Sequence, residues 1–211
     1  MVDYYAKRAG EYEQIYAKPE RQADIRLLRA RCASAFRDQH VLEISCGTGY
    51  WTQVLAPAAQ SVLACDINRE VLEIARSKNW SGSTVKFIEA DSYALPEFER
   101  PFSAGFSGFW WSHIPKMKMR SFLNGFHARL RRGASVIFMD NRYVEGSSTP
   151  IFRTDAHGDS FQQRRLSDGS LHEVLKNFPS REELISAVTD FAEDVEVALL
   201  DYYWILSYRL K

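Results

Sequence analysis

The chain has 211 residues, of which 45% are hydrophobic, enough for one domain with a full apolar core. Its 27 basic and 27 acidic residues give a formal net charge of zero, so no overall field would attract nucleic acid or an anionic membrane. No apolar run is long enough to span a bilayer, and the polar start MVDYYAKRAG is unlike a signal peptide. We therefore expect a single cytoplasmic domain over residues 1–211.

The cysteines form no C-x-x-C pair, so the sequence predicts neither a disulfide framework nor a cysteine-based zinc site. Asp140 and the histidines His113, His157 and His172 show no recognised metal-ligand spacing. We expect small buried thiols and no metal site.

The N-terminal stretch YYAKRAGEYEQIY places Tyr5, Tyr12 and Tyr16 near one face of a helix. We therefore expect a short helical segment within residues 1–18, followed by a longer helix over residues 20–37. An amphipathic segment of this kind can simply pack on the core, or it can cover a ligand site.

Strand and helix signals alternate through the middle of the chain. We expect strands at 40–44, 61–66, 84–91, 102–109 and 134–140, with helices at 48–56, 67–78 and 115–131. Strands that alternate with helices indicate a mostly parallel sheet covered on both faces. The predicted fold is a doubly wound, Rossmann-like α/β domain.

The C-terminal part departs from this alternation. The stretch PSREELISAVTDF, residues 179–191, begins with a Pro-Ser start signal and predicts a helix. The apolar runs at 195–200 and 202–210 follow with almost nothing between them, so they must form an antiparallel hairpin. We expect one reversed strand from this hairpin.

Residues 141–179 form an irregular segment that is too long for a simple connection, which indicates a functional role. Within it, SFQQRRL and SLHEVLKNF flank the Asp-Gly turn SDGS, and this pattern predicts a two-stranded flap over the ligand crevice. We expect the acceptor to be contacted by residues that leave the fifth strand and by the arginine-bearing flap: Asn141, Arg142, Tyr143 and Arg164.

Paired Arg164 and Arg165 can bind a carboxylate or phosphate bidentately, and such a pair can equally form a solvated hairpin face. A mixed aromatic and basic pocket would suit an anionic aromatic metabolite.

The stretch VLEISCGTGYW, residues 41–51, runs from the first strand into a glycine turn. In an open α/β sheet this turn lines the ligand crevice, and Gly47 and Gly49 allow the backbone to approach a ligand closely. The dinucleotide fingerprint G-x-G-x-x-G would require a third glycine, where this chain has Thr52. The turn therefore disfavours a nicotinamide oxidoreductase.

This glycine turn, Asp66 at the end of SVLACD and the stretch EADSYALP together make the chain resemble the class I S-adenosylmethionine-dependent methyltransferases over nearly its whole length. The resemblance implies a seven-stranded sheet with a reversed last strand, and S-adenosylmethionine as cofactor with S-adenosylhomocysteine as product. Ser45 stands where the family usually has glycine or alanine, and its hydroxymethyl group would crowd the cofactor slightly.

The resemblance also implies roles for matching residues. Glu43 would anchor the turn and the methionine ammonium, directly or through water. Asp66 would accept hydrogen bonds from both ribose hydroxyls, and Ile67 would lie against the adenine. The remaining expected cofactor contacts come from the turn, the third strand's end and an N-terminal lid: Ser45, Cys46, Gly47, Thr48, Gly49, Asp91, Ser92, Tyr5 and Tyr12.

The acceptor is expected beside GFSGFWWSHIP, which follows the fourth strand. The Asn/Asp-Pro-Pro-aromatic motif of enzymes that methylate nucleobases or glutamine amides is absent here. Trp110 and Trp111 offer flat apolar area, and His113 can titrate near neutral pH. We consider His113 as a general base or acceptor-orienting residue, and equally as a structural histidine, since transfer from a sulfonium can proceed without a base, because the leaving group is already activated.

These observations favour a small-molecule methyltransferase with an aromatic or anionic acceptor, and no nucleic-acid or membrane partner. A methyltransferase acting on protein or RNA is disfavoured by the zero net charge and the missing motif. A cofactor-binding protein without turnover is the third hypothesis, to which only Ser45 points. The identity of the acceptor and the oligomeric state have no signal in the sequence.

Overall fold

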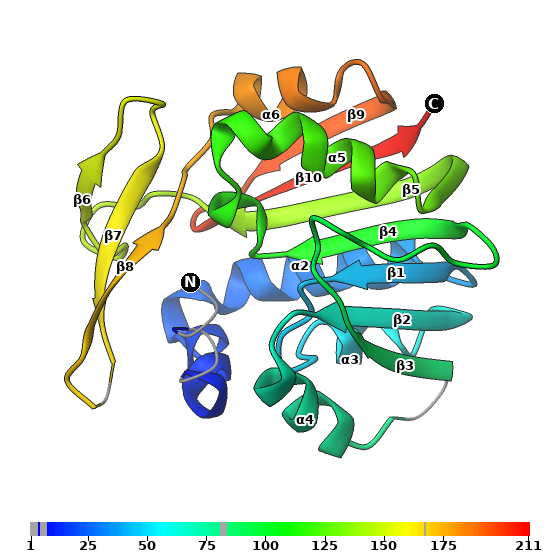
Figure 1. The fold of residues 1–211 in the computed structure, drawn as a ribbon, viewed down its shortest axis with the longest axis horizontal. Helices are drawn as coiled ribbons and strands as arrows, with labels where there is room; N and C mark the ends of the chain where they lie inside the picture. The colour runs from blue at the N-terminus through cyan, green and yellow to red at the C-terminus, as the bar shows by residue number, and fades with distance from the viewer. Residues whose placement is uncertain (1–3, 5–7, 81–83, 167) are drawn as a thin grey trace.

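The computed structural model describes residue 4 and residues 8–80, 84–166 and 168–211. Its main sheet (Figure 1) has seven strands: β1 (His40–Ile44), β2 (Ser61–Asp66), β3 (Thr84–Glu89), β4 (Phe102–Gly108), β5 (Leu130–Asn141), β9 (Ala192–Leu199) and β10 (Tyr203–Leu210). Their order is β3-β2-β1-β4-β5-β10-β9. The predicted doubly wound α/β fold with a seven-stranded, mostly parallel sheet is confirmed.

Strand β10 is the reversed strand, and it pairs antiparallel with both β5 and β9. The predicted C-terminal hairpin is therefore present, with β10 inserted between β5 and β9, so that β9 and not β10 lies at the sheet edge. Figure 1 shows β10 pointing opposite to β5.

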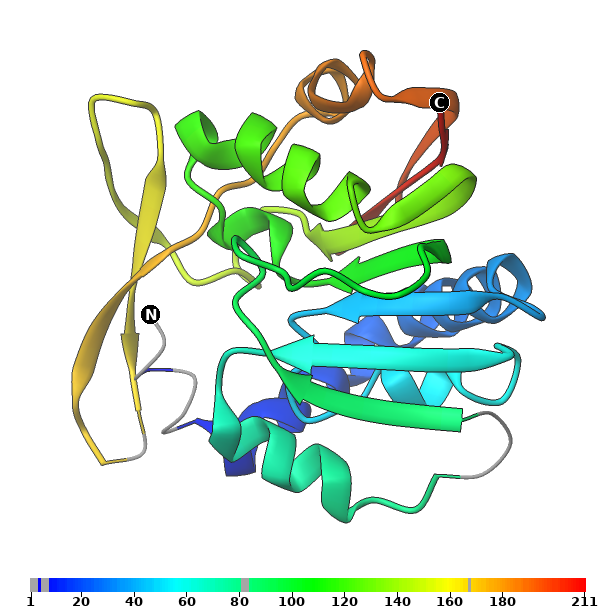
Figure 2. The same cartoon turned by 45° about the vertical axis from the view of Figure 1, so that its right-hand side comes forward.

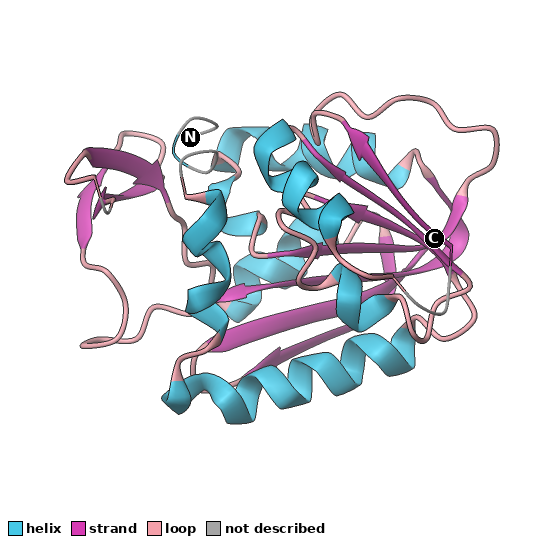
Figure 3. Ribbon diagram, turned by 90° about the horizontal axis from the view of Figure 1, so that it is seen from below, coloured by secondary structure: helices cyan, strands magenta, loops and turns pink. Residues whose placement is uncertain are grey.

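Helices cover both faces of the sheet, as Figure 3 shows from below. On one face, α5 (Met119–His127) and α6 (Arg181–Val188) pack against the even-numbered residues of β5 and β10. On the other face, α2 (Gln22–Ala35) and the short α3 (Thr52–Leu55) pack against the odd-numbered residues of the same strands. This alternation follows from the two-residue period of a strand whose two faces are both buried.

The remaining helices lie around this core. Helix α4 (Arg69–Ser77) packs on β2 and β3. The 3-10 helices are η1 (Ala9–Tyr16), η2 (Pro19–Arg21), η3 (Trp111–His113) and η4 (Lys116–Lys118). In the described part of the chain, no helix has the length and apolarity needed to cross a membrane.

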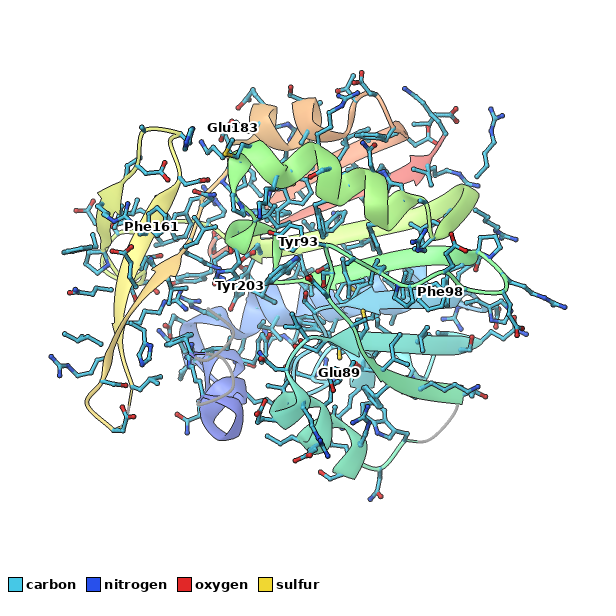
Figure 4. All side chains as sticks on the ribbon, in the orientation of Figure 1. Glu89, Tyr93, Phe98, Phe161, Glu183 and Tyr203 are labelled. Atoms are coloured by element: carbon cyan, nitrogen blue, oxygen red, sulfur yellow. The ribbon has the colours of Figure 1, made fainter. Side chains whose placement is uncertain are left out.

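A second, three-stranded sheet consists of β6 (Ile151–Thr154), β7 (Ser160–Arg165) and β8 (Leu171–Leu175). Strands β7 and β8 form the hairpin expected around SDGS, while β6 was not predicted. Figures 1 and 2 show this small sheet beyond the end of the main sheet at which β1, β4 and β5 finish. In Figure 4, Phe161 of β7 lies apart from Tyr93 and Tyr203 of the main body.

Three expected helices differ from the structure. The helix predicted over residues 115–131 is shorter, because α5 ends at His127 and β5 already begins at Leu130. The helix predicted from residue 48 begins at Thr52, because the preceding turn has positive φ at Ser45, Gly47 and Gly49. The N-terminal segment is the 3-10 helix η1. Tyr5 lies outside the described residues, and the side chain of Tyr12 is also outside them, so their predicted lid role stays a prediction.

Candidate active site

The glycine turn after β1 is held against the end of β2 by a carboxylate. The Asp66 side chain accepts a hydrogen bond from the Gly47 N–H through Oδ2 at 2.9 Å and from the Asn68 N–H through Oδ1, also at 2.9 Å. Burial raises the pKa of Asp66, while these backbone donors oppose the increase. Asp66 thus fixes the turn and presents its oxygens at the carboxyl ends of the strands.

A mostly apolar cavity of about 260 Å³ lies beside this turn. Six of the residues predicted to contact the cofactor line it: Ser45, Gly47, Asp66, Ile67, Asp91 and Ser92. Trp110, predicted on the acceptor side, also lines this cavity, together with Tyr93 and Val71. The cavity combines close backbone, a buried carboxylate and apolar walls, which are the properties that an adenosine-bearing ligand requires.

Ser45 has a positive φ of 53°, a conformation that costs a residue with a side chain about 1 kcal/mol relative to glycine. Its hydroxyl lies 2.9 Å from the Ser92 hydroxyl, so that the two residues connect the turn with the segment after β3. The extra hydroxymethyl group is therefore hydrogen-bonded at the cavity wall.

Glu43 does not line the cavity. It points to the face covered by α2 and α3, where the Thr52 hydroxyl donates to Oε2 at 2.6 Å. Burial raises its pKa to about 8, and the hydrogen bond from Thr52 opposes this increase. Burial therefore favours the neutral form of Glu43, and the residue ties β1 to the helix that follows the turn.

Three other predicted cofactor residues also stand behind the cavity. The Thr48 hydroxyl donates to Glu13 Oε1 at 2.7 Å and so connects the turn with η1. A Cβ atom on Gly49 would lie 3.2 Å from the Ala75 Cβ, so this glycine is required for packing against α4. Cys46 is half-buried, and burial raises the pKa of its thiol.

A second cavity, of about 400 Å³, shares Phe109 and His113 with the first. It lies between the main sheet and the small sheet, and its lining carries six basic side chains: Arg8, Lys18, Arg21, Arg164, Arg165 and Lys176. No aspartate or glutamate is among the described residues that line it. The predicted acceptor residues Asn141 and Arg164 face this cavity, which we refer to as the cationic cavity.

Lys176, which lines the cationic cavity, forms a buried ion pair. The Lys176 ammonium lies 2.8 Å from Asp140 Oδ1 and donates to the Ser112 hydroxyl at 2.6 Å. Burial disfavours the ionised form of Asp140, but Lys176 and the other donors outweigh this and lower the Asp140 pKa to about 2. Asp140 also accepts from the backbone N–H groups of Ser112 and Asn141. The pair fixes the end of β5 to β8 and η3.

His113 borders both cavities. Its Nδ1 lies 2.6 Å from the Leu175 carbonyl oxygen, which can only accept, so Nδ1 carries the proton. Burial, with the neighbouring Lys176 cation, lowers the pKa of His113 well below its ordinary value. The imidazole is therefore neutral at physiological pH.

Three predicted acceptor residues lie outside both cavities. Trp111 is buried in the core, where its ring packs edge-on against Phe138 and Trp204. The Arg142 guanidinium donates to the Leu200 carbonyl, and Tyr143 packs edge-on against Phe178 at 5.3 Å.

Sequence reasoning missed several residues that the structure brings to the site. Phe109 lies between the two cavities with a positive φ of 64°, held by a hydrogen bond of 2.7 Å from its N–H to the Met139 carbonyl. Arg21 and Lys176 line the cationic cavity. The sequence signal that could have indicated the burial of Lys176 is its position directly after the apolar pair Val174–Leu175. Across the described ranges, no cluster of three or more His, Cys, Asp or Glu side chains could hold a metal ion.

Comparison with known proteins matched residues 41–133 to a family described as "Methyltransferase domain". A demethylmenaquinone methyltransferase of Staphylococcus aureus (strain MRSA252) is 26% identical over 156 residues, which cover 68% of this chain and 63% of the relative. The chain thus spans less than two thirds of that relative's length.

Solved structures are similar over a larger share of the chain. The DhpI–SAH complex is 26% identical with a TM-score of 0.79, over 99% of this chain and 94% of that one. The DhpI–SAM–HEP complex is 25% identical with a TM-score of 0.80, over 99% and 95%. The N-methyltransferase NodS from Bradyrhizobium japonicum WM9, solved with S-adenosyl-L-homocysteine, is 19% identical with a TM-score of 0.61, over 90% and 87%, and at this identity shares the fold alone.

Proposed function

We propose that this chain, a class I S-adenosylmethionine-dependent methyltransferase, transfers the methyl group of its cofactor to a small-molecule acceptor that carries an anionic group. The observation that supports this most is the pair of contiguous cavities. One is apolar and has a buried carboxylate, the other is cationic, and they share Phe109 and His113. A cofactor in the first cavity and an anion in the second would meet at these two residues.

On the cofactor side, we propose that Asp66 binds the ribose hydroxyls and that Ile67, Asp91 and Ser92 surround the adenine. All four line the apolar cavity. The Asp66 oxygens accept from the backbone N–H groups of Gly47 and Asn68, and the carboxylate has lone-pair capacity left for a hydroxyl donor. Because Glu43 stands behind the wall, its contact with the methionine ammonium would run through water or through the turn.

On the acceptor side, we propose contacts from Trp110, Asn141 and Arg164, with the aromatic ring of Phe178 beside them. S-adenosylmethionine, when bound, would supply an activated methyl group: the acceptor's lone pair would form the new bond to the methyl carbon, and the carbon–sulfur bond would break with its electron pair left on sulfur. An ionised oxygen needs no base for this step, and in-line positioning at about 3.5 Å can supply much of the acceleration. His113 would orient the acceptor, and it is the candidate base for an acceptor that must lose a proton.

Calorimetric titration with S-adenosylhomocysteine tests the cofactor side, with NAD as the competing ligand class. We expect binding to the wild-type chain, and binding weaker by roughly ten- to a hundredfold for Asp66→Ala, because hydrogen bonds to a charged group are lost. Glu99→Ala, which removes an exposed carboxylate, is the matched control and should bind like the wild type. Binding of NAD in place of S-adenosylhomocysteine would contradict the proposal.

The acceptor side is tested by measuring S-adenosylhomocysteine formation with a panel of small aromatic and aliphatic anions, each beside its uncharged amide or ester. We expect turnover with members of the anionic set only. Turnover with the uncharged set, or a salt-sensitive affinity for RNA, would contradict an anionic small-molecule acceptor. Tight cofactor binding without turnover on any acceptor would favour a non-catalytic protein of this fold.

A further inference from the structure

The side chain of Arg21 enters the cationic cavity from the start of α2. It is 91% buried, with a relative exposure of 9%, although it carries a permanent charge. Its Nη1 donates to Asn141 Oδ1 at 3.3 Å and its Nη2 to the Ser147 hydroxyl at 3.0 Å. Both partners are neutral. Its Nε is buried and has no hydrogen-bond partner among the described residues.

The charge of Arg21 is also without a direct counter-charge. In the described part of the chain, no carboxylate forms an ion pair with it, whereas the exposed Arg153 and Arg120 each have one. Two buried acids connect with Arg21 only indirectly: Asn141 Nδ2 donates to Asp140 Oδ1 at 3.0 Å, and Asp24, three residues further along the chain, accepts from the Tyr202 N–H at 2.7 Å. The Asp140 carboxylate is already paired with Lys176 at 2.8 Å.

Two aromatic rings attract the guanidinium of Arg21 without neutralising it. Its Cζ lies 5.2 Å from the Tyr202 ring centroid and 5.6 Å from that of Tyr203. Such contacts are weak compared with an ion pair in a buried site. A buried guanidinium normally lies beside an anion, because desolvation of the charge is otherwise uncompensated.

We infer that Arg21 is the residue that selects an acceptor with an oxyanion, and that the bound acceptor supplies its missing counter-ion. This inference rests on the proposed function and deepens it by naming the recognition residue and the chemistry that it recognises. The guanidinium offers a planar set of N–H donors that matches the two oxygens of a carboxylate or a phosphoryl group. Arg164 lines the same cavity and adds a second guanidinium.

The hydrogen bonds of Arg21 also set its direction. Asn141 accepts from Arg21 and donates to Asp140, so the buried ion pair at the end of β5 orients the guanidinium through one amide. Ser147, in the segment after β5, holds the other Nη atom. The anion would therefore be held in the same cavity as Phe109 and His113, the two residues that border the cofactor side.

The test uses inorganic phosphate and acetate as probes, titrated calorimetrically into the full chain saturated with S-adenosylhomocysteine at constant ionic strength. We expect wild-type binding of at least one probe, and binding at least about tenfold weaker for Arg21→Gln, because a charge-assisted bidentate contact is lost. Arg26→Gln, which removes an exposed arginine of the adjoining helix α2, should stay within about twofold of the wild type. Phosphate bound more tightly than acetate would assign a phosphoryl group to the acceptor, and the reverse order a carboxylate.

Arg21→Lys keeps the positive charge but loses the planar set of N–H donors. It therefore tests oxyanion recognition by Arg21 if Arg21→Gln fails to fold. We expect binding of the preferred probe to weaken by more than about threefold in this variant. Unchanged probe affinity in Arg21→Lys or Arg21→Gln, or no binding of either probe by the wild type, would overturn the inference. S-adenosylhomocysteine is titrated before the probes. If the wild type does not bind it, the proposed function is overturned, and this result is distinct from a failure to bind the probes.

Discussion

The buried carboxyl of Glu43 should make folding stability depend on pH in a way that Glu43→Gln removes. Burial raises its pKa from the ordinary 4.5 to about 8 in the folded chain. Below pH 4.5, both the folded and the unfolded chain hold the proton, and stability is unaffected. Between pH 4.5 and 8, only the unfolded chain loses it, so the free energy of unfolding falls by about 1.4 kcal/mol per pH unit. This amounts to about 3 kcal/mol by pH 7 and about 4 kcal/mol by pH 8, where the folded carboxyl is itself half ionised.

Urea unfolding of wild type and Glu43→Gln at pH 5, 6, 7 and 8 measures this directly. We expect the stability of the variant relative to the wild type to increase with pH, since glutamine keeps the shape and cannot ionise. Other titrating groups are common to both chains and cancel in the difference. Glu99→Gln, an exposed control, should show a difference that does not vary with pH. If the difference in free energy of unfolding between Glu43→Gln and the wild type is constant from pH 5 to 8, the pKa of Glu43 is not raised in the folded chain.

The same carboxyl should report on cofactor binding. If the methionine ammonium is held near Glu43, the carboxyl should ionise when S-adenosylhomocysteine binds. Calorimetry at pH 7 in buffers of different ionisation enthalpy should then detect release of about 0.9 proton per ligand by the wild type. Glu43→Gln should release close to none. Equal proton release from both chains would show that Glu43 does not sense the ammonium.

Two further predictions concern stability, both measured by urea unfolding. Lys176→Met should lower the free energy of unfolding by about 3–5 kcal/mol, because it leaves the buried Asp140 carboxylate unpaired. The double variant Asp140→Asn/Lys176→Met should regain about 2 kcal/mol of this loss, since it also removes the unpaired charge. If the double variant is no more stable than Lys176→Met, the unpaired charge is not the cause. Gly49→Ala should lower the free energy of unfolding by about 1–3 kcal/mol, because the φ of Gly49 is +77° and a Cβ would crowd Ala75. Gly125→Ala, at a helical position with open space around it, should raise the free energy of unfolding by about 0.5–1 kcal/mol. Equal effects of the two glycine changes would argue against that account.

The strands of the main sheet could be predicted from the sequence because each is a short buried run with turn signals on either side. The glycine turn was also visible, since Gly47 and Gly49 mark a backbone that must adopt positive φ. In contrast, β6 (Ile151–Thr154) is exposed along its whole length, so no alternation of apolar and polar residues marks it. It exists because β7 offers it an edge to pair with.

The basic residues of the cationic cavity were harder to find, for a physical reason. Arg21 follows Pro-Glu at a helix start, and Lys176 follows an apolar pair, positions where a charged residue is usually solvated. Arg21 and Lys176 become buried at one cavity because the fold brings β5, β8 and the start of α2 together. Trp111 differs in the opposite direction: it was predicted to contact the acceptor, but its ring packs in the core against Phe138 and Trp204.

The insertion of β10 between β5 and β9 has a consequence for how the chain folds. Strand β9 pairs with the sheet only through β10, although it comes earlier in the sequence. Until residues 203–210 are available, β5 has an open edge and the apolar side chains of β9 have no place in the sheet. During synthesis, these two surfaces must stay apart from other chains until the last strand enters the gap. We expect premature release within this strand to produce chains that aggregate through the open edge of β5.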